Sequence, residues 1–584
     1  MGFDLSTQQL KCVCVDSKFV VQYEAKVDFD DDLAKYGIEK GVLSHAAEGE
    51  VFAPPAMWLE AVDLVLDRLH QEGLDFGKIK GLSGAGMQHG TVFWNSNAEH
   101  LLSNLDPEQS LVQQLSSSEE SKNAFAHPMS PNWQDASTQT EVEAFDSCLG
   151  DAATLAKVTG SKAHHRFSGP QILRYRKKYP EHYYNTARIS LVSSFFASIF
   201  LGTIAPIDIS DVTGMNLWDI HSSKWHGSLL ELTAGGKSSI PSLISKLSQP
   251  NQTPETPLGT INPYFITRFG FPPDCQVQPF TGDNPSTILS LPLLPGDAVI
   301  SLGTSTTFLM STPTYLPSPE YHLMNHPATK NLYMFMLCYK NGGLARELVR
   351  DQLNNIITDY RITPNSTSDP TDPWAKFNSL ALSTPPLSQP TPGGAMRMGL
   401  YFPKPEIVPP LRACQYRFLY TPAASPSKNP PARGSPSYPS KARGSLDPLP
   451  PTPHPTDALT ILESQFLSIR QRSNSPPKKI YLVGGGSSNP AIARVCGDVL
   501  SPEEGVFTLK LGGNACALGS AYRAVWAGEG GQGWEEFIDQ RWRGEVRGVE
   551  REEGRGDLFE LYGIAAQGFR EMERLVVEEQ KRAS

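Results

Sequence analysis

The chain has 584 residues, of which 39% are hydrophobic and 19% are charged. This length exceeds what one ordinary hydrophobic core accommodates, so we expect two large domains. The formal net charge of −10 argues against nucleic acid or an anionic membrane as the main partner, because both require a basic surface.

The eight cysteines are scattered along the chain, without CxxC pairs and without a His/Cys cluster at zinc spacing. This distribution is typical of reduced thiols, so we expect a cytoplasmic protein. The sequence opens directly on GFDLSTQQ, and no charged and then apolar leader is evident.

Short apolar runs alternate with longer stretches of helical apolar spacing, which is the pattern of an α/β protein. We predict strands at Lys11–Asp16, Ile79–Ser83, Asp297–Ser301 and Ile480–Val483, and helices at Trp58–His70 and Ala458–Arg470. The longest uncharged run, Ile189–Pro206, contains four serines and a glycine, so it is predicted to be a buried helix and not a membrane span.

Two segments about 300 residues apart share one pattern, Gly2–Asp16 and Ala298–Ser311. Each has an apolar strand, a turn of small polar residues and a second strand, although the first strand of the first copy is nearly absent because Met1 falls almost on the turn. This similarity suggests a duplicated architecture in which each half presents a polar turn to one shared cleft. A chance likeness of two Ser/Thr-rich hairpins is the competing interpretation.

The first turn carries Asp4, Ser6 and Thr7, and the second turn, Ser301–Thr307, contains Thr304. A carboxylate followed by hydroxyls and turn amides suits a hydrated Mg²⁺–phosphate group. The second turn offers the same hydroxyls and amides without the carboxylate. Most Ser/Thr turns only cap the local backbone, and that interpretation stays open for each turn taken alone.

Three polar segments follow in the first half of the chain. Gln88 and His89 lie in a glycine-punctuated loop after a predicted strand, and Trp133 with Asp135 pairs an aromatic face with a carboxylate, as carbohydrate sites do. Arg166 is suited to contact a sugar or a phosphate. Each has an ordinary structural alternative: a buried core histidine, a salt-bridge partner or a packed core.

Asp283 lies between Gly282 and Asn284-Pro285, in a turn near the junction of the two halves. A carboxylate held on such a turn could serve as the base in phosphoryl transfer, whereas many Asp residues in such segments only shape the turn.

The glycine-rich turn Gly484–Asn489 connects a predicted strand to a helix-like run. Such a turn lets a ligand approach the backbone closely, and a nucleotide base or ribose is the ligand we expect. A tight turn without a ligand explains the pattern equally well.

One further segment, Thr421–Thr456, contains eleven prolines among Ser, Lys, Arg and Ala. Because it has little apolar surface to bury, we expect a disordered surface insertion there.

The chain has neither a GxxxxGK[ST] phosphate loop nor a protein-kinase catalytic loop. Taken in order, its segments resemble the FGGY carbohydrate kinases and, within them, the eukaryotic, fungal-type xylulose kinases. The matching segments are GFDLSTQQLK, SGAGMQHGTVFW, SPNWQDAST, RFSGPQI, APIDISDVTGMNLWDI, TGDNPST, ISLGTSTTF, YLVGGGSSN and NACALGSAYRA. Together they span about residues 2–525, and the joint match is far more specific than any single piece.

The resemblance implies two actin-like ATPase domains, each of ribonuclease-H type, hinged around a central cleft. We expect a sugar-binding domain over residues 1–286 and an ATP-binding domain over 287–584, the latter containing the insertion. The implied activity is ATP-dependent phosphorylation of D-xylulose to D-xylulose 5-phosphate, with ATP and Mg²⁺ required. A small-molecule sugar, ATP and a second copy of the chain, in a homodimer, are the expected partners.

The resemblance also implies roles for individual residues. Asp283 would be the catalytic base, and His89, Arg166, Asp283 and Asn284 would contact the sugar. The predicted ATP-binding residues are Ser6, Thr7, Thr304, Trp374, Gly484, Gly485, Gly486 and Asn489. Asp4 would be the carboxylate near Mg²⁺.

The sequence departs from the family pattern at two places near these residues. Family members normally carry several residues before GFDL, and Met87 stands where the eukaryotic branch usually has Gln. Two alternatives remain open: another FGGY substrate (ribulose, gluconate or glycerol) and a non-catalytic sugar sensor with the same fold.

Overall fold

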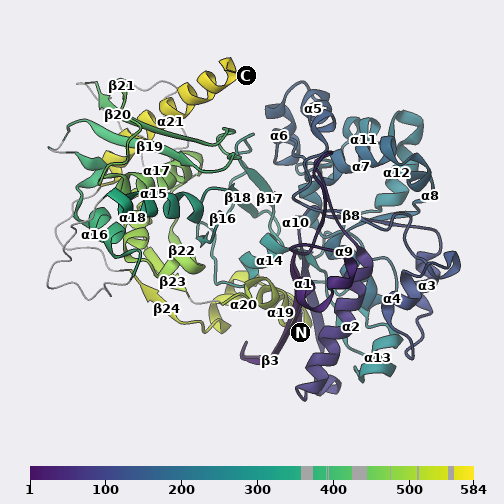
Figure 1. Ribbon diagram of the computed structural model, residues 1–584. Coiled ribbons are helices and arrows are strands. Elements are labelled where there is room, and N and C mark those ends of the chain that lie inside the picture. Colours follow the sequence, from purple (N-terminus) through teal and green to yellow (C-terminus); the bar gives the residue numbers. More distant parts are fainter. Residues whose placement is uncertain are drawn as a thin grey trace. The chain divides into compact units, whose positions relative to one another are not determined.

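The computed structural model describes residues 1–356, 372–389, 391, 393–423, 444–473, 475–509, 512–549 and 558–583. The chain divides into two compact units, each assembled from three segments (Figure 1). The first unit comprises Met1–Leu294, Tyr315–Met334 and Gly513–Arg543; the second comprises Pro295–Thr314, Phe335–Gly512 and Gly544–Ser584. These bounds differ from a single division after residue 286, because two later segments fold with the first unit.

The first unit contains most of the helices. Its strands are β1 Gly2–Leu5, β2 Gln9–Val15, β3 Val21–Asp28, β4 Leu43–His45, β5 Glu50–Ala53, β6 Gly81–Gly86, β7 Thr91–Trp94, β8 Ser130–Pro131, β9 Arg188–Leu191, β10 Trp218–Asp219, β11 Lys224–Trp225, β12 Gly259–Thr260, β13 Gln276–Val277, β14 Thr281–Gly282 and β17 His322–Asn325. Its helices are α1 Phe29–Asp32, α2 Pro55–Gln71, α3 Ala98–Ser103, α4 Leu111–Leu115, α5 Gln139–Cys148, α6 Ala152–Thr159, α7 Ser168–Lys178, α8 Pro180–Asn185, α9 Val192–Leu201, α10 Ile209–Val212, α11 Gly227–Ala234, α12 Ile240–Leu247, α13 Pro263–Phe269, α14 Asp283–Leu289, α19 Ala515–Gly528 and α20 Trp534–Arg541.

The central sheet of the first unit has the strand order β12-β13-β6-β1-β2-β3, and β14 also pairs with β6. Strand β1 lies between an antiparallel partner, β2, and a parallel partner, β6. Side chains alternate between the faces of a strand, so Phe3 and Asp4 point to opposite sides of the sheet. Phe3 packs against Phe196 and Phe200 of α9, with ring centroids 5.4 and 4.9 Å away.

Of two predicted helices, one shows the expected spacing of buried residues and the other is buried along almost its whole length. Helix α2 begins at Pro55, which suits the first turn of a helix, and buries Trp58, Val62 and Leu66 along one side. The run 189–206 is buried as expected, but its first residues form strand β9 and the helix, α9, begins only at Val192. In the parts of the chain that the structure describes, no helix has the length and apolar character to cross a membrane.

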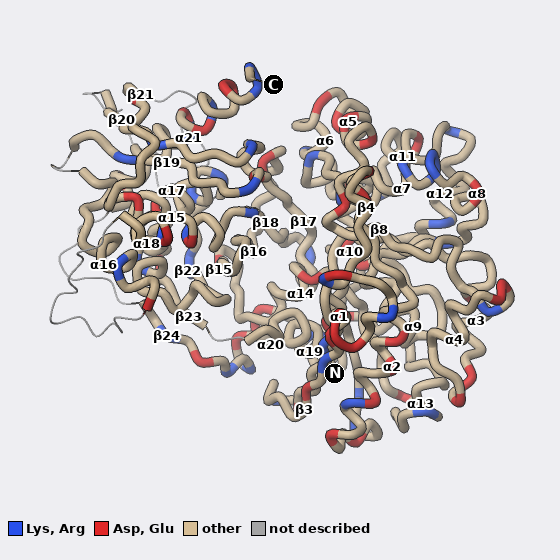
Figure 2. Tube along the Cα trace, in the orientation of Figure 1, with Lys and Arg blue, Asp and Glu red and all other residues tan. Residues whose placement is uncertain are grey.

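Charged residues of both signs are distributed over each unit (Figure 2). The acidic run Asp30–Asp32 lies on α1, directly after strand β3. Arg68 of α2 donates to Asp32 at 2.6 Å and also to the carbonyl of Lys26. This contact fastens the end of the β2–β3 hairpin to α2.

The second unit is built around its own sheet. Its strands are β15 Ala298–Leu302, β16 Thr306–Thr312, β18 Tyr333–Tyr339, β19 Met396–Phe402, β20 Cys414–Pro422, β21 Gly444–Pro448, β22 Lys479–Val483, β23 Gly505–Leu509 and β24 Val546–Gly548. Its helices are α15 Gly343–Ile356, α16 Ala375–Ser383, α17 Asp457–Arg472, α18 Pro490–Leu500 and α21 Phe559–Arg582.

The two central sheets repeat one pairing pattern. Strand β15 lies between antiparallel β16 and parallel β22, just as β1 lies between antiparallel β2 and parallel β6. Sheet order continues from β16 to β18 and from β22 to β23 and β24. The two hairpins seen in the sequence therefore occupy equivalent central positions in two related sheets, which is the duplicated architecture that their similarity predicted.

The proline-rich segment is described only at its two ends, because residues 424–443 lie outside the described residues. Residues 421–422 and 444–448 are in strands: Thr421 pairs with Ser445 and Pro422 with Gly444 in an antiparallel ladder between β20 and β21. The expected disorder over 421–456 is therefore wrong for these paired residues. Backbone pairing to β20 provides the order that the composition of the segment does not predict.

Candidate active site

Two buried aspartates of the first unit, Asp4 and Asp211, are both influenced by the charge of the half-buried Asp283. Burial raises the pKa of Asp4 to about 7, and the nearby charge of Asp283 raises it further in the same direction. Burial likewise raises the pKa of Asp211 to about 7, with added repulsion from Asp208 and Asp283. Clustered carboxylates with raised pKa values are characteristic of functional sites, because burying like charges is costly unless it serves a purpose.

Asp283 is the first residue of α14, directly after the short strand β14. Its carboxylate accepts hydrogen bonds from the backbone N–H of Asn284 at 2.8 Å and from the Asn284 side chain at 3.1 Å. Asn284 Nδ2 also donates to Gln88 Oε1 at 2.9 Å. Burial raises the pKa of Asp283 to about 6 despite these hydrogen bonds. The carboxylate is thus held in one orientation and is mainly ionised at neutral pH.

Helix α14 is fixed by close packing on α19. Gly519 makes this possible, because a Cβ at that position would lie 1.9 Å from the carbonyl oxygen of Ser286. Ser286 Oγ in turn donates to the carbonyl of Cys516 at 2.8 Å, in the first turn of α19. Because α19 also packs on β1 and β6, Asp283 and Asp4 are attached to one rigid framework. This packing explains why residues 513–543 belong to the first unit.

Asp4 has the properties of a ligand-binding carboxylate. It is only 4% exposed, and its Oδ1 atom has no hydrogen-bond partner among the described residues. No group of three or more His, Cys, Asp or Glu suited to a metal occurs in the described part of the chain. Mg²⁺ is usually held by one or two carboxylates together with substrate phosphates and water, so a single buried carboxylate fits Mg²⁺ bound with a nucleotide.

His89 and Arg166 lie in a separate polar and aromatic cluster of the same unit. The His89 backbone has φ of +74°, which is uncommon for a non-glycine residue, and its Nδ1 lies 3.2 Å from the carbonyl oxygen of Gly214. Its ring stacks on Phe167 with centroids 4.6 Å apart. Burial and the neighbouring Arg166 charge hold the pKa of His89 well below its usual value, so the ring is neutral. Gln88, which precedes His89 in the chain, accepts the hydrogen bond from Asn284.

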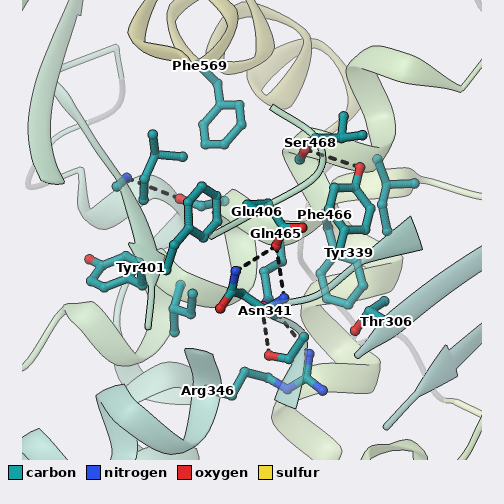
Figure 3. Close-up of a pocket in the computed structure, with 18 of the residues that line it drawn as sticks. Thr306, Tyr339, Asn341, Arg346, Tyr401, Glu406, Gln465, Phe466, Ser468 and Phe569 are labelled. Atoms are coloured by element: carbon teal, nitrogen blue, oxygen red, sulfur yellow. Dashed lines mark hydrogen bonds between the residues drawn. The ribbon is translucent and has the colours of Figure 1, made fainter. Parts of the chain in front are cut away.

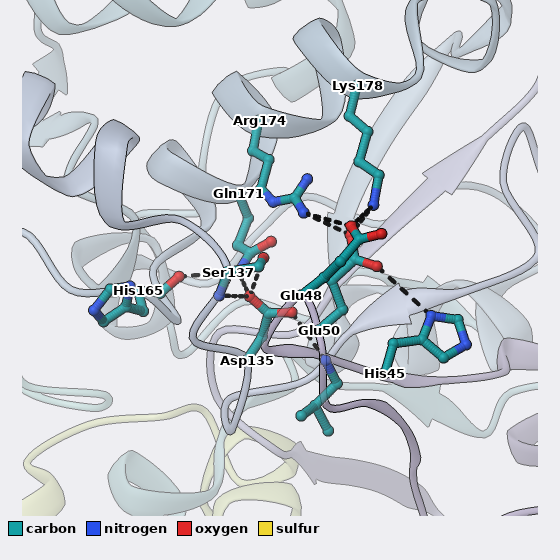
Figure 4. Close-up of polar contacts among 10 residues, drawn as sticks. His45, Glu48, Glu50, Asp135, Ser137, His165, Gln171, Arg174 and Lys178 are labelled. Carbon is teal, nitrogen blue, oxygen red and sulfur yellow. Dashed lines mark hydrogen bonds and ion pairs between the residues drawn. The ribbon is translucent and has the colours of Figure 1, made fainter.

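The backbone before Arg166 is anchored by a buried network around Asp135 (Figure 4). Asp135 accepts hydrogen bonds from the backbone N–H of Val51, from Ser137 and from Gln171, the last at 2.7 Å. Gln171 also donates to the carbonyl of His165 at 2.9 Å. The sequence suggested Asp135 as a carbohydrate contact. In the structure its carboxylate instead accepts hydrogen bonds from protein groups that position the start of α7.

A second part of this network holds the far end of α7. Arg174 and Lys178, one helical turn apart, both contact Glu50 of β5, and Arg174 does so at 2.7 Å (Figure 4). Glu50 is 3% exposed and Arg174 is also largely buried, so the pair is screened from solvent. Helix α7 is consequently fixed at both ends, which limits the movement of the Arg166–Phe167 segment at its start.

We expect opposite stability effects from two carboxylates of the first unit, Asp211 and Asp135. Because the pKa of Asp211 is raised in the folded protein, ionising this carboxyl lowers the stability of the fold. The stabilisation by the protonated carboxyl is fully present below pH 3.8, the pKa in the unfolded chain, and is lost as pH rises through about 7. Asp211→Asn should therefore increase the free energy of unfolding at pH 8 by about 1–4 kcal/mol, and by less at pH 5.

The matched control is Asp135→Asn, which should lower stability at both pH values because an amide has only one acceptor oxygen, whereas the carboxylate uses Oδ1 for Ser137 and Gln171 and Oδ2 for the Val51 N–H. Urea denaturation at pH 5 and pH 8 measures both effects. A loss of stability in Asp211→Asn at pH 8 would contradict the buried-charge interpretation.

The remaining predicted residues of the first unit lie in the turn between β1 and β2. Ser6 Oγ donates to the carbonyl of Gln9 at 2.9 Å, which closes the turn. Thr7 Oγ1 accepts a hydrogen bond from the indole N–H of Trp133 at 2.9 Å, although the Trp133 side chain is 43% exposed. This turn follows Asp4 directly, so its hydroxyls and the buried carboxylate belong to one end of β1.

The other predicted nucleotide residues gather in the second unit. Strands β15 and β22 are parallel, so the turn containing Thr304 and the turn beginning at Gly484 leave the same edge of the sheet. Gly484 has φ of +87°, a conformation that L side chains rarely adopt, and its Cα faces the backbone of Leu302. A Cβ atom added at Gly485 would have no neighbouring atom within 4 Å, so there is space for a ligand beside the backbone of this turn.

Asn489 and Trp374 complete the group around these turns. Asn489 caps α18 by accepting from the backbone N–H groups of Ala491 and Ile492, and it donates to Asn378 of α16 at 2.8 Å. Trp374 directly precedes α16 and lies against the Arg350 guanidinium, 4.6 Å from the ring centroid. The structure thus brings Thr304, the glycine turn, Asn489 and the start of α16 together within one unit.

A cavity in the second unit is lined mainly by residues of β19 and α17 (Figure 3). Its lining includes Thr306, Asn341, Arg346, Tyr401 and Gln465. Gln465 donates to the carbonyl of Asn341 and accepts from Arg346, both at 2.9 Å, so these polar groups satisfy one another. The cavity measures about 30 Å³, the volume of about one water, and is therefore too small for a nucleotide.

Sequence reasoning missed two members of the first-unit site, Asp211 and His322. Asp211 lies in a segment that matched the family pattern, but nothing in its local sequence distinguishes it from a helix-capping residue. His322 lies in YHLMNH, far along the chain from Arg166, and its position follows only from the return of residues 315–334 to the first unit.

Comparisons with known proteins agree with this arrangement. Residues 298–528 match the model of the C-terminal domain of the FGGY family of carbohydrate kinases. A probable D-xylulose kinase A of Aspergillus terreus is 52% identical over 596 aligned residues, covering 100% of this chain and 98% of that protein.

Solved structures match at much lower identity. A xylulose kinase from Rhodospirillum rubrum superposes with a TM-score of 0.71 at 15% identity, covering 99% of this chain and 98% of that one. A gluconate kinase from Lactobacillus acidophilus gives 0.67 at 16% identity, with 100% and 97% covered. At these identities the likeness concerns the fold, and the fold does not distinguish the sugars.

Two related α/β units, each with a polar hairpin turn at the centre of its sheet, define the architecture of an ATP-dependent sugar kinase, as the sequence predicted. The full-length match at 52% identity makes the assignment definite. The chain belongs to the FGGY family of carbohydrate kinases.

Proposed function

We propose that this protein transfers the γ-phosphate of ATP to D-xylulose and forms D-xylulose 5-phosphate. The observation that carries the proposal is Asp283, a half-buried, oriented carboxylate with a pKa of about 6. Its partner Asn284 also donates to Gln88, the residue that precedes His89 in the chain. The substrate is suggested by the probable D-xylulose kinase A relative, which matches over the whole chain.

In the proposed reaction, Asp283 is the catalytic base. Its carboxylate accepts the proton of the terminal hydroxyl of the ketose while that oxygen forms a bond to the γ-phosphorus of ATP. The bond between the γ-phosphorus and the bridging oxygen breaks, and ADP leaves. Because a loose phosphoryl-transfer transition state requires only partial proton removal, a carboxylate with a pKa near 6 is a sufficient base.

The other residues position the two substrates. His89, Arg166 and Asn284 are proposed to contact the sugar hydroxyls, with His89 neutral and held by Gly214 and Phe167. The nucleotide is proposed to bind at Ser6 and Thr7 of the first unit and at Thr304, Trp374, Gly484, Gly485, Gly486 and Asn489 of the second. Positioning of this kind supplies most of the rate in phosphoryl transfer.

Asp4 is proposed to hold Mg²⁺ together with the nucleotide phosphates. Its unpartnered, buried Oδ1 supports this assignment. When bound, the ion neutralises charge on the phosphates of ATP. A cytoplasmic location and a homodimer remain predictions from the sequence and belong to this proposal.

A panel of acceptors tests the substrate assignment. Purified protein with Mg-ATP should release ADP fastest with D-xylulose and more slowly with D-ribulose, gluconate or glycerol, in an assay coupled to ADP. A preference for glycerol or gluconate would overturn the choice of sugar. Binding of D-xylulose without ADP release, in wild type and with Mg²⁺ in excess, would favour a non-catalytic sensor.

A further inference from the structure

Strand β17 brings a histidine, His322, to the Arg166 cluster from far along the chain. The preceding hairpin, β15–β16, belongs to the second unit, but residues 315–334 fold with the first. Leu323 donates its backbone N–H to the carbonyl of Gly160 at 2.9 Å, which docks β17 beside the segment that leads to Arg166. This backbone contact fixes the position of His322 relative to that segment.

The His322 ring is buried and hydrogen-bonded through both nitrogens. Its exposed fraction is 4%, Arg166 Nη2 lies 2.9 Å from Nε2, and Ser161 Oγ lies 3.0 Å from Nδ1. A guanidinium group carries donors only, so Nε2 is the acceptor and the ring proton resides on Nδ1, where it is donated to Ser161. One neutral tautomer satisfies both contacts.

Aromatic packing fixes the plane of the ring. His164 meets His322 edge to face at 4.7 Å, and Phe167 lies 5.4 Å away. Phe167 also stacks on His89, so the rings of His322, Phe167 and His89 form a continuous series. Displacing His322 would therefore affect Arg166 directly and His89 through Phe167.

We propose that His322 is a positioning residue of the sugar site, which orients the Arg166 guanidinium toward the ketose as an acceptor in its Nδ1–H tautomer. Together with the anchoring of the His165 carbonyl by Gln171, it holds Arg166 at both the backbone and the tip of the side chain. This inference rests on the proposed function, in which Arg166 contacts the sugar.

Two substitutions separate the hydrogen bond from packing. In His322→Gln the amide oxygen takes the approximate place of Nε2 and still accepts from Arg166, whereas His322→Leu fills similar space without an acceptor. We expect His322→Leu to raise KM for D-xylulose about 10–100-fold, the range of a hydrogen bond to a charged group, with KM for ATP within about twofold. His322→Gln should restore KM for D-xylulose to within about fivefold of wild type.

Equal KM values for D-xylulose in His322→Leu and His322→Gln would overturn the proposal. So would an equal rise in KM for D-xylulose and for ATP in His322→Leu. If His322→Leu does not fold, Ser161→Ala serves as the second variant, and it should raise KM for D-xylulose without changing KM for ATP. No change in Ser161→Ala would then contradict the proposal.

A spectroscopic measurement is independent of turnover. Long-range ¹⁵N–¹H NMR of histidine-labelled wild type, with the signal of residue 322 assigned from its loss in His322→Gln, should show a neutral ring protonated on Nδ1. Protonation on Nε2 would contradict the Arg166 contact even in an active enzyme. Failure of wild type to phosphorylate D-xylulose, with the Nδ1–H tautomer present, would instead count against the proposed substrate.

Discussion

Replacement of Asp283 by Ala is expected to lower kcat for D-xylulose by about 10²–10⁴-fold, the usual contribution of a general base. The side chain starts α14, which is held against α19 by the close approach at Gly519, so the substitution should remove the carboxylate without moving the helix. KM for ATP should change little, because the nucleotide residues belong to other segments. Initial rates of ADP release at saturating substrates measure the effect.

Stability should change in the opposite direction to activity in Asp283→Ala. Burial raises the pKa of Asp283 to about 6, which means that its charge opposes folding at neutral pH, and its removal should increase thermal stability at pH 8. Asp274→Ala, at an exposed position in the preceding loop, is the matched control and should leave kcat unchanged. A variant of Asp283 that retains wild-type turnover would rule out its role as the base.

The pH dependence of wild type provides a second measurement of the same group. The base must be ionised to accept a proton, so kcat/KM should fall about tenfold per pH unit below about pH 6. In Asp283→Ala the residual rate should lose this dependence. If kcat/KM of the wild type stays constant down to pH 5, Asp283 is not the catalytic base.

Asp208→Ala is expected to destabilise the protein by about 3–5 kcal/mol, the cost of leaving a buried charge without its partner. Arg523 of α19 donates to Asp208 at 2.8 Å, and the two side chains are 0% and 1% exposed. Nε and Nη1 of Arg523 have no partner among the described residues, so the guanidinium depends heavily on Asp208. Because Asp208 caps α10, which carries Asp211, the pair joins two parts of the candidate site.

A double variant distinguishes loss of the pair from loss of packing. Asp208→Leu combined with Arg523→Met removes both charges, and it should recover most of the stability lost in Asp208→Ala. The exposed pair Arg574–Glu578 on α21 is the control, where Glu578→Ala should leave the free energy of unfolding nearly unchanged because solvent screens the pair. Urea unfolding measures all three. A loss below about 1 kcal/mol in Asp208→Ala would show that the ion pair contributes little.

Local sequence patterns predicted the helices and strands well where the spacing of apolar residues matches the face that is buried. Helix α2 and strand β22 lie close to their predicted bounds because apolar spacing directly determines which face is buried. The β1–β2 and β15–β16 hairpins were recognisable because each combines apolar strands with a polar turn. The ends of the proline-rich segment were mispredicted, since pairing with β20 is a long-range contact that composition does not encode.

The sequence by itself determined the family and the α/β class, because short motifs of fixed order carry that information. The same motifs made Asp4, His89, Arg166 and Asp283 candidates for the site. Only the tertiary structure decided which of them share an environment. The coupling of Asp211 to Asp283, the contact of His322 with Arg166 and the return of α19 to the first sheet join residues that are widely separated along the chain. Burial and long-range packing, not local sequence, set the charges and orientations of these side chains.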